Sequence, residues 1–219
     1  MHVDAEEWRA QLARGVARRV RHYRLMRGLS VQKLADICTE EYGLPIKRTV
    51  LANFEAGRRP ALSVAELLIL ARILRVPPIL LLFPVGQEAA TEVLPGTSVD
   101  TWSASKWFTG ESEEIPGHNE EPQDTEAIHL YREHDQVVEE WREVQRKIKA
   151  FLGAVGEELE RAEPGPEALN KERLWDAAAT ELRNSEEAIR GVRRSIRAHG
   201  LTPPALPAEM ARIEQKGDG

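Results

Sequence analysis

Residues 29–74 read LSVQKLADICTEEYGLPIKRTVLANFEAGRRPALSVAELLILARIL, and this stretch determines the expected fold. Ser30 is a good N-cap for the helix that follows it, because its hydroxyl can accept an amide hydrogen of the first turn. The segment Gly43-Leu44-Pro45 must end that helix, since glycine supports a turn and proline lacks an amide donor. The next helix is expected at about 47–56, and Gly57 can end it in a left-handed conformation.

Further helices are expected on both sides of these two. Ser63 and Glu66 form a capping-box pattern at the start of an apolar run, so a helix should follow Ser63. A long first helix fits about 4–26, and a short helix fits 79–83. We therefore expect five helices within residues 1–84.

The composition of the whole chain favours helices over sheets. Of the 219 residues, 42% are hydrophobic and only 5% are aromatic. Alanine, leucine, glutamate and arginine are abundant, and these residues stabilise helices. The expected fold class is all-α.

Cysteine usage and hydropathy indicate a cytoplasmic protein. Cys38 is the sole cysteine, so an intrachain disulfide is excluded. No basic leader followed by an apolar run opens the chain at Met1. The most apolar stretch, 67–83, is interrupted by Arg72, Arg75 and a pair of prolines, so no membrane span is expected.

The net charge of −6 conceals a division between two parts of the chain. Residues 1–84 carry 14 Lys and Arg against 8 Asp and Glu, which gives +6, whereas residues 85–219 carry 16 against 28, which gives −12. The basic part is therefore the candidate for binding a polyanion. Ordinary variation of surface charge is the alternative.

Residues 85–125 are expected to form an acidic linker. Gly, Pro, Ser, Thr and Glu are frequent there, and no apolar periodicity persists. An aromatic island, WSASKWF at 102–108, interrupts this composition. We interpret the island as a segment that docks on a folded neighbour, with a ligand or partner contact as the alternative.

Two heptad patterns in residues 126–200 predict an antiparallel helical hairpin, because a Pro-Gly-Pro break at 164–166 leaves room for only a short loop. The residues of the expected coiled-coil seam are Val138, Trp141, Ile148, Leu152, Trp175, Leu182 and Ile189. Self-association into a four-helix bundle would cover this face, and packing on the N-terminal domain is the alternative. Residues 201–219 begin with LTPPALP and are expected to form a flexible tail.

A set of motif positions runs through the first 84 residues in a recognisable order. The most specific part is FEAGRRP at 54–60, followed by Leu-x-x-Leu-Ala-x-x-Leu from Leu67. The other matching positions are Leu29, Ser30, Leu34, Ala35, Leu51, Val76, Leu81 and Leu82. Over about residues 12–84 the chain resembles the Cro/repressor-type (XRE) helix-turn-helix family. The resemblance implies a five-helix, lambda-repressor-like domain that binds double-stranded DNA.

The helix at 47–56 then corresponds to the recognition helix of that family. A helix about 10 to 12 Å wide fits the major groove of B-DNA, where each base pair shows a distinct pattern of donors and acceptors. Val50, Leu51 and Phe54 form the apolar side of this helix, so residues on its other faces are the expected base readers. They are Arg48, Thr49, Ala52 and Asn53.

Contacts to the DNA backbone are expected from helix starts and from the turn after the recognition helix. These residues are Ser30, Gln32, Lys47, Arg58 and Arg59. In the family, the start of the recognition helix and the turn after it run beside the phosphates. Ser30 and Gln32 lie at the positive end of the preceding helix. For the two arginines, an ordinary solvated surface is the alternative.

Two features depart from the family pattern. Val31 stands where the family commonly has a glutamine, although Gln32 follows at once. Extra residues separate Ala35 from Glu55, which lengthens the second helix or the turn after it.

No catalytic, metal or cofactor site is expected. His129 and His134 are five positions apart, whereas two ligands on one helix face are four apart. Cys38 has no ligand-type residue beside it, and no Gly-rich phosphate loop, Gly-x-Ser-x-Gly or His-Glu-x-x-His motif occurs.

The expected function is that of a dimeric, sequence-specific transcriptional regulator that binds a pseudo-palindromic operator. The resemblance to the family favours repression of transcription over activation. The excess of arginine over lysine, 23 to 7, is typical of a GC-rich bacterial genome. The alternative is an antitoxin-like or other interaction regulator whose acidic C-terminal helices bind a protein partner.

Overall fold

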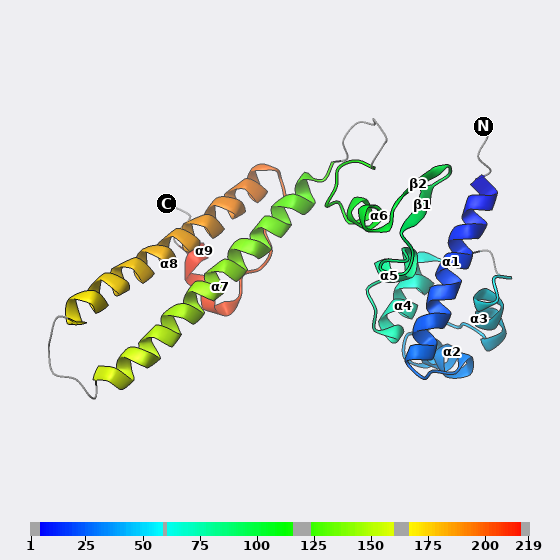
Figure 1. The fold of residues 1–219 in the computed structure, drawn as a ribbon, viewed down its shortest axis with the longest axis horizontal. Coiled ribbons are helices and arrows are strands. Elements are labelled where there is room, and N and C mark those ends of the chain that lie inside the picture. The colour runs from blue at the N-terminus through cyan, green and yellow to red at the C-terminus, as the bar shows by residue number, and fades with distance from the viewer. Residues whose placement is uncertain (1–4, 59–60, 116–123, 160–166, 216–219) are drawn as a thin grey trace. The chain divides into compact units, whose positions relative to one another are not determined.

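The computed structural model describes residues 5–58, 61–115, 124–159 and 167–215. The chain divides into two compact units, Met1–Gln123 and Asp124–Gly219. Figure 1 shows a helical cluster with a small hairpin in the first unit and a long pair of helices in the second, so most of the chain is helical, as expected. Within the described ranges, no helix is both long and apolar enough to cross a membrane.

The first unit contains the five expected helices around one core. They are α1 (Ala5–Met26), α2 (Val31–Glu40), α3 (Arg48–Glu55), α4 (Val64–Leu74) and α5 (Ile79–Leu82). Leu34, Leu51, Phe54 and Leu70 are among the largest side chains buried in this core. Cys38 is buried there too, and burial raises the pKa of its thiol to about 11.

Local chemistry sets the ends of these helices as the sequence predicts. Ser30 Oγ accepts the amide hydrogen of Lys33 at the start of α2, over 3.0 Å. Ser63 and Glu66 form a reciprocal capping box at the start of α4, with N···O distances of 3.2 and 2.8 Å. Gly57 follows α3 with φ of +70°, a conformation that favours a residue without a Cβ.

Residues 85–115 are not the irregular linker that the composition predicts, and the all-α prediction is corrected here. Strands β1 (Ala90–Leu94) and β2 (Thr97–Asp100) pair antiparallel, and α6 (Thr101–Phe108) follows them. Their buried side chains form a second core cluster with the end of the helical region: Phe83, Val93, Val99, Ala104 and Ile115. The segment therefore belongs to the first compact unit.

The aromatic island at 102–108 coincides with α6. Trp107 packs against the second core cluster, and the ring of Phe108 meets that of Phe83 edge to face at 5.5 Å. Trp102, by contrast, is exposed. The island thus packs within its own unit through two of its three aromatic side chains.

The second unit is the expected antiparallel pair of long helices, α7 (Glu126–Leu159) and α8 (Glu167–Ala198). The prediction of a flexible tail is corrected, because η1 (Ala208–Met210) and α9 (Ala211–Gln215) follow α8. Met210 and Ile213 are fully buried in one cluster with residues of both long helices. Gly200 turns the chain after α8 with φ of +72°, and the prolines beyond it do not prevent a later helical turn from burying apolar side chains.

The tail covers part of the face that the heptads assign to a dimer seam. Val138, Trp141 and Ile189 share the core cluster of Met210 and Ile213 and are buried within one chain, so they are not free to form a seam. The remaining seam residues are half-buried or exposed: Ile148 and Leu182 in the first class, Leu152 and Trp175 in the second.

His134 of α7 is buried in the second unit against a positive charge. Its Nε2 lies 3.1 Å from Nη1 of Arg193. Because a guanidinium can only donate, Nε2 accepts and Nδ1 carries the proton. Burial, and then the charge of Arg193, lower the pKa of His134 below its ordinary value, so folding favours the neutral ring.

We expect the free energy of unfolding to fall as the pH drops below about 6.5. The unfolded chain then binds a proton that the folded His134 does not, whereas above that pH the ring is neutral in both states. Urea titrations at about pH 7.5 and 5.5 measure the loss. In His134→Gln, whose amide oxygen can accept the same hydrogen bond without titrating, the loss should be smaller. An equal loss in both proteins would contradict this assignment.

Candidate nucleic-acid interface

Helix α3 presents one side to the core and another to solvent. Leu51 and Phe54 are buried, whereas Arg48, Thr49 and Asn53 are exposed and Ala52 is half-buried. At a rise of 1.5 Å per residue, Arg48 and Asn53 are about 7.5 Å apart along the helix axis. Around the axis they are about 140° apart, so they lie at the two edges of the solvent side, with Ala52 and Thr49 between them.

Lys47 is the N-cap of α3 and not its first helical residue. Its carbonyl accepts the amide hydrogens of Val50 and Leu51 at 2.9 and 3.1 Å, and its side chain makes no capping hydrogen bond. The first amides of α3 therefore point out of the helix start, where the helix dipole favours an anion. The exposed ammonium of Lys47 belongs to the same helix end, which can bind a phosphate.

The start of α2 carries a second set of polar side chains. Ser30 caps the helix, and the side-chain amide of Gln32 donates to Asp36 Oδ1 at 2.6 Å. A phosphate contact by Gln32 therefore requires that this hydrogen bond be exchanged. Lys33 is exposed in the same turn and was not predicted. Its place in the first turn of a capped helix is the signal that could have identified it.

The turn after α3 is held by two backbone hydrogen bonds. Gly57 N donates to Phe54 O and Arg58 N donates to Asn53 O, both at 2.8 Å. The Arg58 side chain is exposed, as a phosphate contact requires. Arg59, the other backbone contact predicted in this turn, lies outside the described residues.

The extra residues between α2 and α3 pack on the core. Leu44 N donates to Cys38 O at 2.9 Å, and Gly43 turns the chain with φ of +63°. Ile46 is buried in the main core cluster directly before Lys47. Burial of Ile46 therefore fixes the point at which α3 begins.

A buried ion pair that the sequence analysis missed holds α3 against α1. Arg24 donates from Nε and Nη2 to the two carboxylate oxygens of Glu55, at 2.7 and 2.6 Å, and from Nη1 to Leu29 O at 2.7 Å. The two side chains are 7% and 6% exposed. The hydrogen bonds with Glu55 raise the pKa of Arg24. One guanidinium thus joins α1, the segment before α2 and the last residue of α3.

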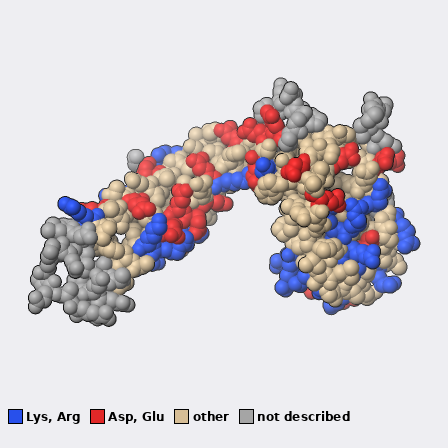
Figure 2. All heavy atoms as spheres, in the orientation of Figure 1, with Lys and Arg blue, Asp and Glu red and all other residues tan. Residues whose placement is uncertain are grey.

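Charged side chains are unevenly distributed over the first unit. Figure 2 shows Lys and Arg over the helices of this unit, and Asp and Glu gathered near the hairpin, α6 and the start of α1. The basic excess of residues 1–84 lies mainly on α1, which carries six arginines against two glutamates. Helices α2 and α3 together carry two basic residues, Lys33 and Arg48, against three acidic ones.

The chain matches no protein-family model, no curated protein and no solved structure. In the part of the chain that the structure describes, no group of three or more His, Cys, Asp and Glu residues is placed to hold a metal ion. The geometry of α2, α3 and the turn after α3 is therefore the basis for assigning a function.

Replacing Glu55 with Gln should lower the free energy of unfolding of the first unit by about 3 kcal/mol, because the Arg24 charge would stay buried without its partner. Urea denaturation measures this loss. Arg21→Ala is the matched control, since Arg21 is an exposed arginine of the same helix, and it should cost less than about 0.5 kcal/mol.

The double variant Arg24→Met, Glu55→Met should recover much of the stability that Glu55→Gln loses, because no unpaired charge then remains in the core. If Glu55→Gln cost no more than Arg21→Ala, the ion pair would not be what holds α3 in place.

Proposed function

We propose that this chain is a sequence-specific regulator of transcription that reads double-stranded DNA with α3. One observation carries the proposal: Arg48, Thr49 and Asn53 share the solvent side of a short helix whose opposite side is anchored in the core. The resemblance of FEAGRRP and its neighbouring motif positions to the Cro/repressor-type (XRE) family supports the same assignment.

The side chains on α3 suit direct reading of bases in the major groove. Arg48 can donate two hydrogen bonds to the guanine acceptors, and Asn53 can pair with adenine. Each such contact provides about 1–3 kcal/mol of discrimination against a wrong base. Thr49 and Ala52 present methyl groups that can meet the methyl of thymine.

The residues around α3 provide contacts that position the domain without reading sequence. The start of α3 with Lys47, the capped start of α2 with Ser30, Gln32 and Lys33, and the turn with Arg58 are all exposed. Contacts of these kinds to phosphates fix the register and orientation of a protein on the duplex. Several of them together make the affinity depend steeply on salt.

We place the dimer contact near the end of the hairpin where α7 stops and α8 begins. Leu152, Leu174 and Trp175 are 41%, 46% and 40% exposed there, and Trp175 packs edge to face on Phe151. Two helices alone cannot cover these side chains, whereas the same face of a second copy would complete a four-helix bundle. The dimer would read a pseudo-palindromic operator and repress by obstructing polymerase.

A second candidate function is the binding of a protein partner through the same face. The exposed apolar residues lie in the part of the chain that carries an excess of acidic residues, −12 over residues 85–219. A partner with an apolar strip flanked by basic side chains would complement it. The regulator would then be antitoxin-like, with DNA contacts in a secondary role.

In vitro selection of random duplex DNA on the full chain should enrich an inverted repeat, and the double variant Arg48→Ala, Asn53→Ala should enrich none. Neither side chain makes a hydrogen bond or ion pair within the described residues, so the thermal midpoint should stay nearly unchanged. Arg72→Ala, which removes an exposed arginine of α4, should select the wild-type site.

Raising the salt from about 50 to 200 mM should weaken binding to the selected site by orders of magnitude.

The proposal fails if the wild-type chain enriches no sequence in the selection, or if the double variant enriches the same repeat. Enrichment that depends on Arg48 and Asn53 would leave the partner-binding candidate without support as the main function.

The double variant Leu152→Glu, Trp175→Glu should shift the chain from dimer to monomer in sedimentation analysis. Both side chains are about 40% exposed in one chain, so this variant should lose less stability than one that empties a buried site. Trp141→Ala is the contrasting variant, because Trp141 is 4% exposed, and it should cost about 3–5 kcal/mol of stability. An unchanged sedimentation profile of the Glu variant would exclude this face as the dimer contact.

A further inference from the structure

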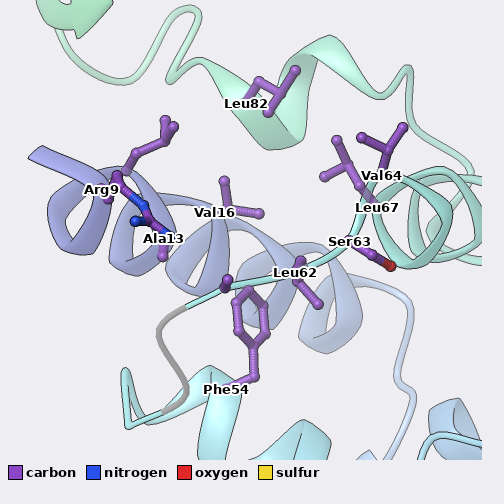
Figure 3. A pocket seen from close by; sticks show the side chains of 11 residues that line it. Arg9, Ala13, Val16, Phe54, Leu62, Ser63, Val64, Leu67 and Leu82 are labelled. Atoms are coloured by element: carbon purple, nitrogen blue, oxygen red, sulfur yellow. The ribbon is translucent and has the colours of Figure 1, made fainter. Parts of the chain in front are cut away.

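An apolar pocket of about 240 Å³ opens in the first unit between α1, α5 and the segment that leads into α4. In Figure 3, Arg9 lies at one end of the hollow and Leu67 at the other, with Leu82 on one side and Val16 and Phe54 on the opposite side. Apart from Arg9 and Ser63, the side chains that line the pocket are apolar. A mostly apolar hollow with few polar groups is typical of small-molecule sites.

Hydrogen bonds hold the α5 side of this pocket in place. The buried side chain of Arg19 on α1 donates from Nε to Leu81 O at 2.8 Å and from Nη2 to Leu82 O at 2.6 Å. Gly15 makes room for this guanidinium, because a Cβ at Gly15 would lie 3.2 Å from its nitrogens. Leu82 is therefore fixed at a set distance from α1 and does not collapse into the hollow.

The end of the pocket near Leu67 is held by the capping box that starts α4. Ser63 and Glu66 bond each other through both backbone amides, so Ser63, which lines the pocket, has a fixed backbone. With the α5 side and the Leu67 end held, the pocket exists before any ligand arrives. A preformed site avoids the cost of ordering its walls on binding.

We propose that this pocket binds a small organic acid with one carboxylate and an apolar body. A cavity of about 150 Å³ accepts benzene, so a pocket of about 240 Å³ suits a ring or short alkyl chain with a small head group, about ten non-hydrogen atoms in all. Within the described residues, the exposed Arg9 side chain makes no hydrogen bond or ion pair. Its guanidinium can therefore form a bidentate pair with a carboxylate at the end of the pocket.

Phe54 connects the pocket with the candidate DNA interface. It is fully buried, lines the pocket and belongs to α3, the helix that carries Arg48 and Asn53. An acid that packs on Phe54 differently in the DNA-bound and free states would change DNA affinity, and DNA would change acid affinity by the same factor. This regulatory step rests on the proposed function, whereas the binding of the acid does not.

Isothermal titration of the full chain with 3-phenylpropionate, and with 3-phenylpropan-1-ol as its uncharged counterpart, tests the site without DNA. We expect the wild-type chain to bind the acid at least about tenfold more tightly, because only the acid can pair with Arg9. Arg9→Gln should abolish this preference and leave the affinity for the alcohol unchanged. Arg21→Gln, on the same helix about 18 Å away, should retain the preference.

Ala13→Leu places a larger side chain in the pocket and should remove binding of both compounds, with the thermal midpoint recorded beside it. If that variant fails to fold, the titrations of Arg9→Gln and Arg21→Gln with the acid and the alcohol test the site. The proposal is overturned if the wild-type chain does not bind 3-phenylpropionate at millimolar concentration, or if Arg9→Gln keeps the preference for the acid.

The regulatory step is measured separately, as the affinity for the selected operator with and without saturating 3-phenylpropionate. A change in operator affinity that is lost in Arg9→Gln supports the coupling, and an unchanged affinity removes the coupling while the ligand site stands. A chain that binds the acid but selects no DNA sequence overturns the proposed function and leaves the pocket assigned.

Discussion

The ion pair between Arg24 and Glu55 is the contact on which the arrangement of the first unit depends. A charge taken out of water needs a partner of fixed geometry, so this pair sets both the distance and the rotation of α3 against α1. A helix turned by one residue moves its side chains by about 100° around the axis. Arg48 and Asn53 are about 140° apart around the axis, so such a rotation would carry one of them away from the solvent side. The exposed set on α3 is thus determined by a buried contact at the far end of the same helix.

Helix α1 carries a second buried arginine, and together the two make this helix the organiser of the unit. Arg19 and Arg24 are five positions apart, which places them about 140° apart around the axis. One therefore reaches the end of α5 and the other reaches α3. Burial, followed by the charge of Arg18, lowers the pKa of Arg19 to about 10, so it is still a cation and a donor near neutral pH. Helix α1 therefore positions both α5, which forms one wall of the apolar pocket, and α3.

The features that could be predicted from the sequence are those that depend on neighbouring residues. The helix starts at Ser30 and Ser63 follow from caps between residues three apart, and the two sides of α3 follow from its periodicity. The β-hairpin of β1 and β2 was not predicted, because its strands are short and polar on one side. The polar composition of residues 85–125 concealed the turn at Gly96. Contacts between distant segments, such as Arg24 with Glu55 or Met210 with the long helices, leave no mark in local spacing. The exposed residues of the candidate site could therefore be predicted, whereas the buried contacts that hold α3 in place could not.

Cys38 illustrates what burial in this core means for the chemistry of the chain. Its thiol has no exposed surface and a pKa of about 11, so almost no thiolate is present near neutral pH. Oxidants and alkylating agents attack the thiolate, and they can reach this sulfur only when the core opens. Because Leu44 N bonds to the Cys38 carbonyl, such an opening also loosens the segment that leads into α3. Cys38 therefore cannot act as an oxidation-sensitive switch in the folded chain. A molecule in which Cys38 is modified would be one whose native core had already opened.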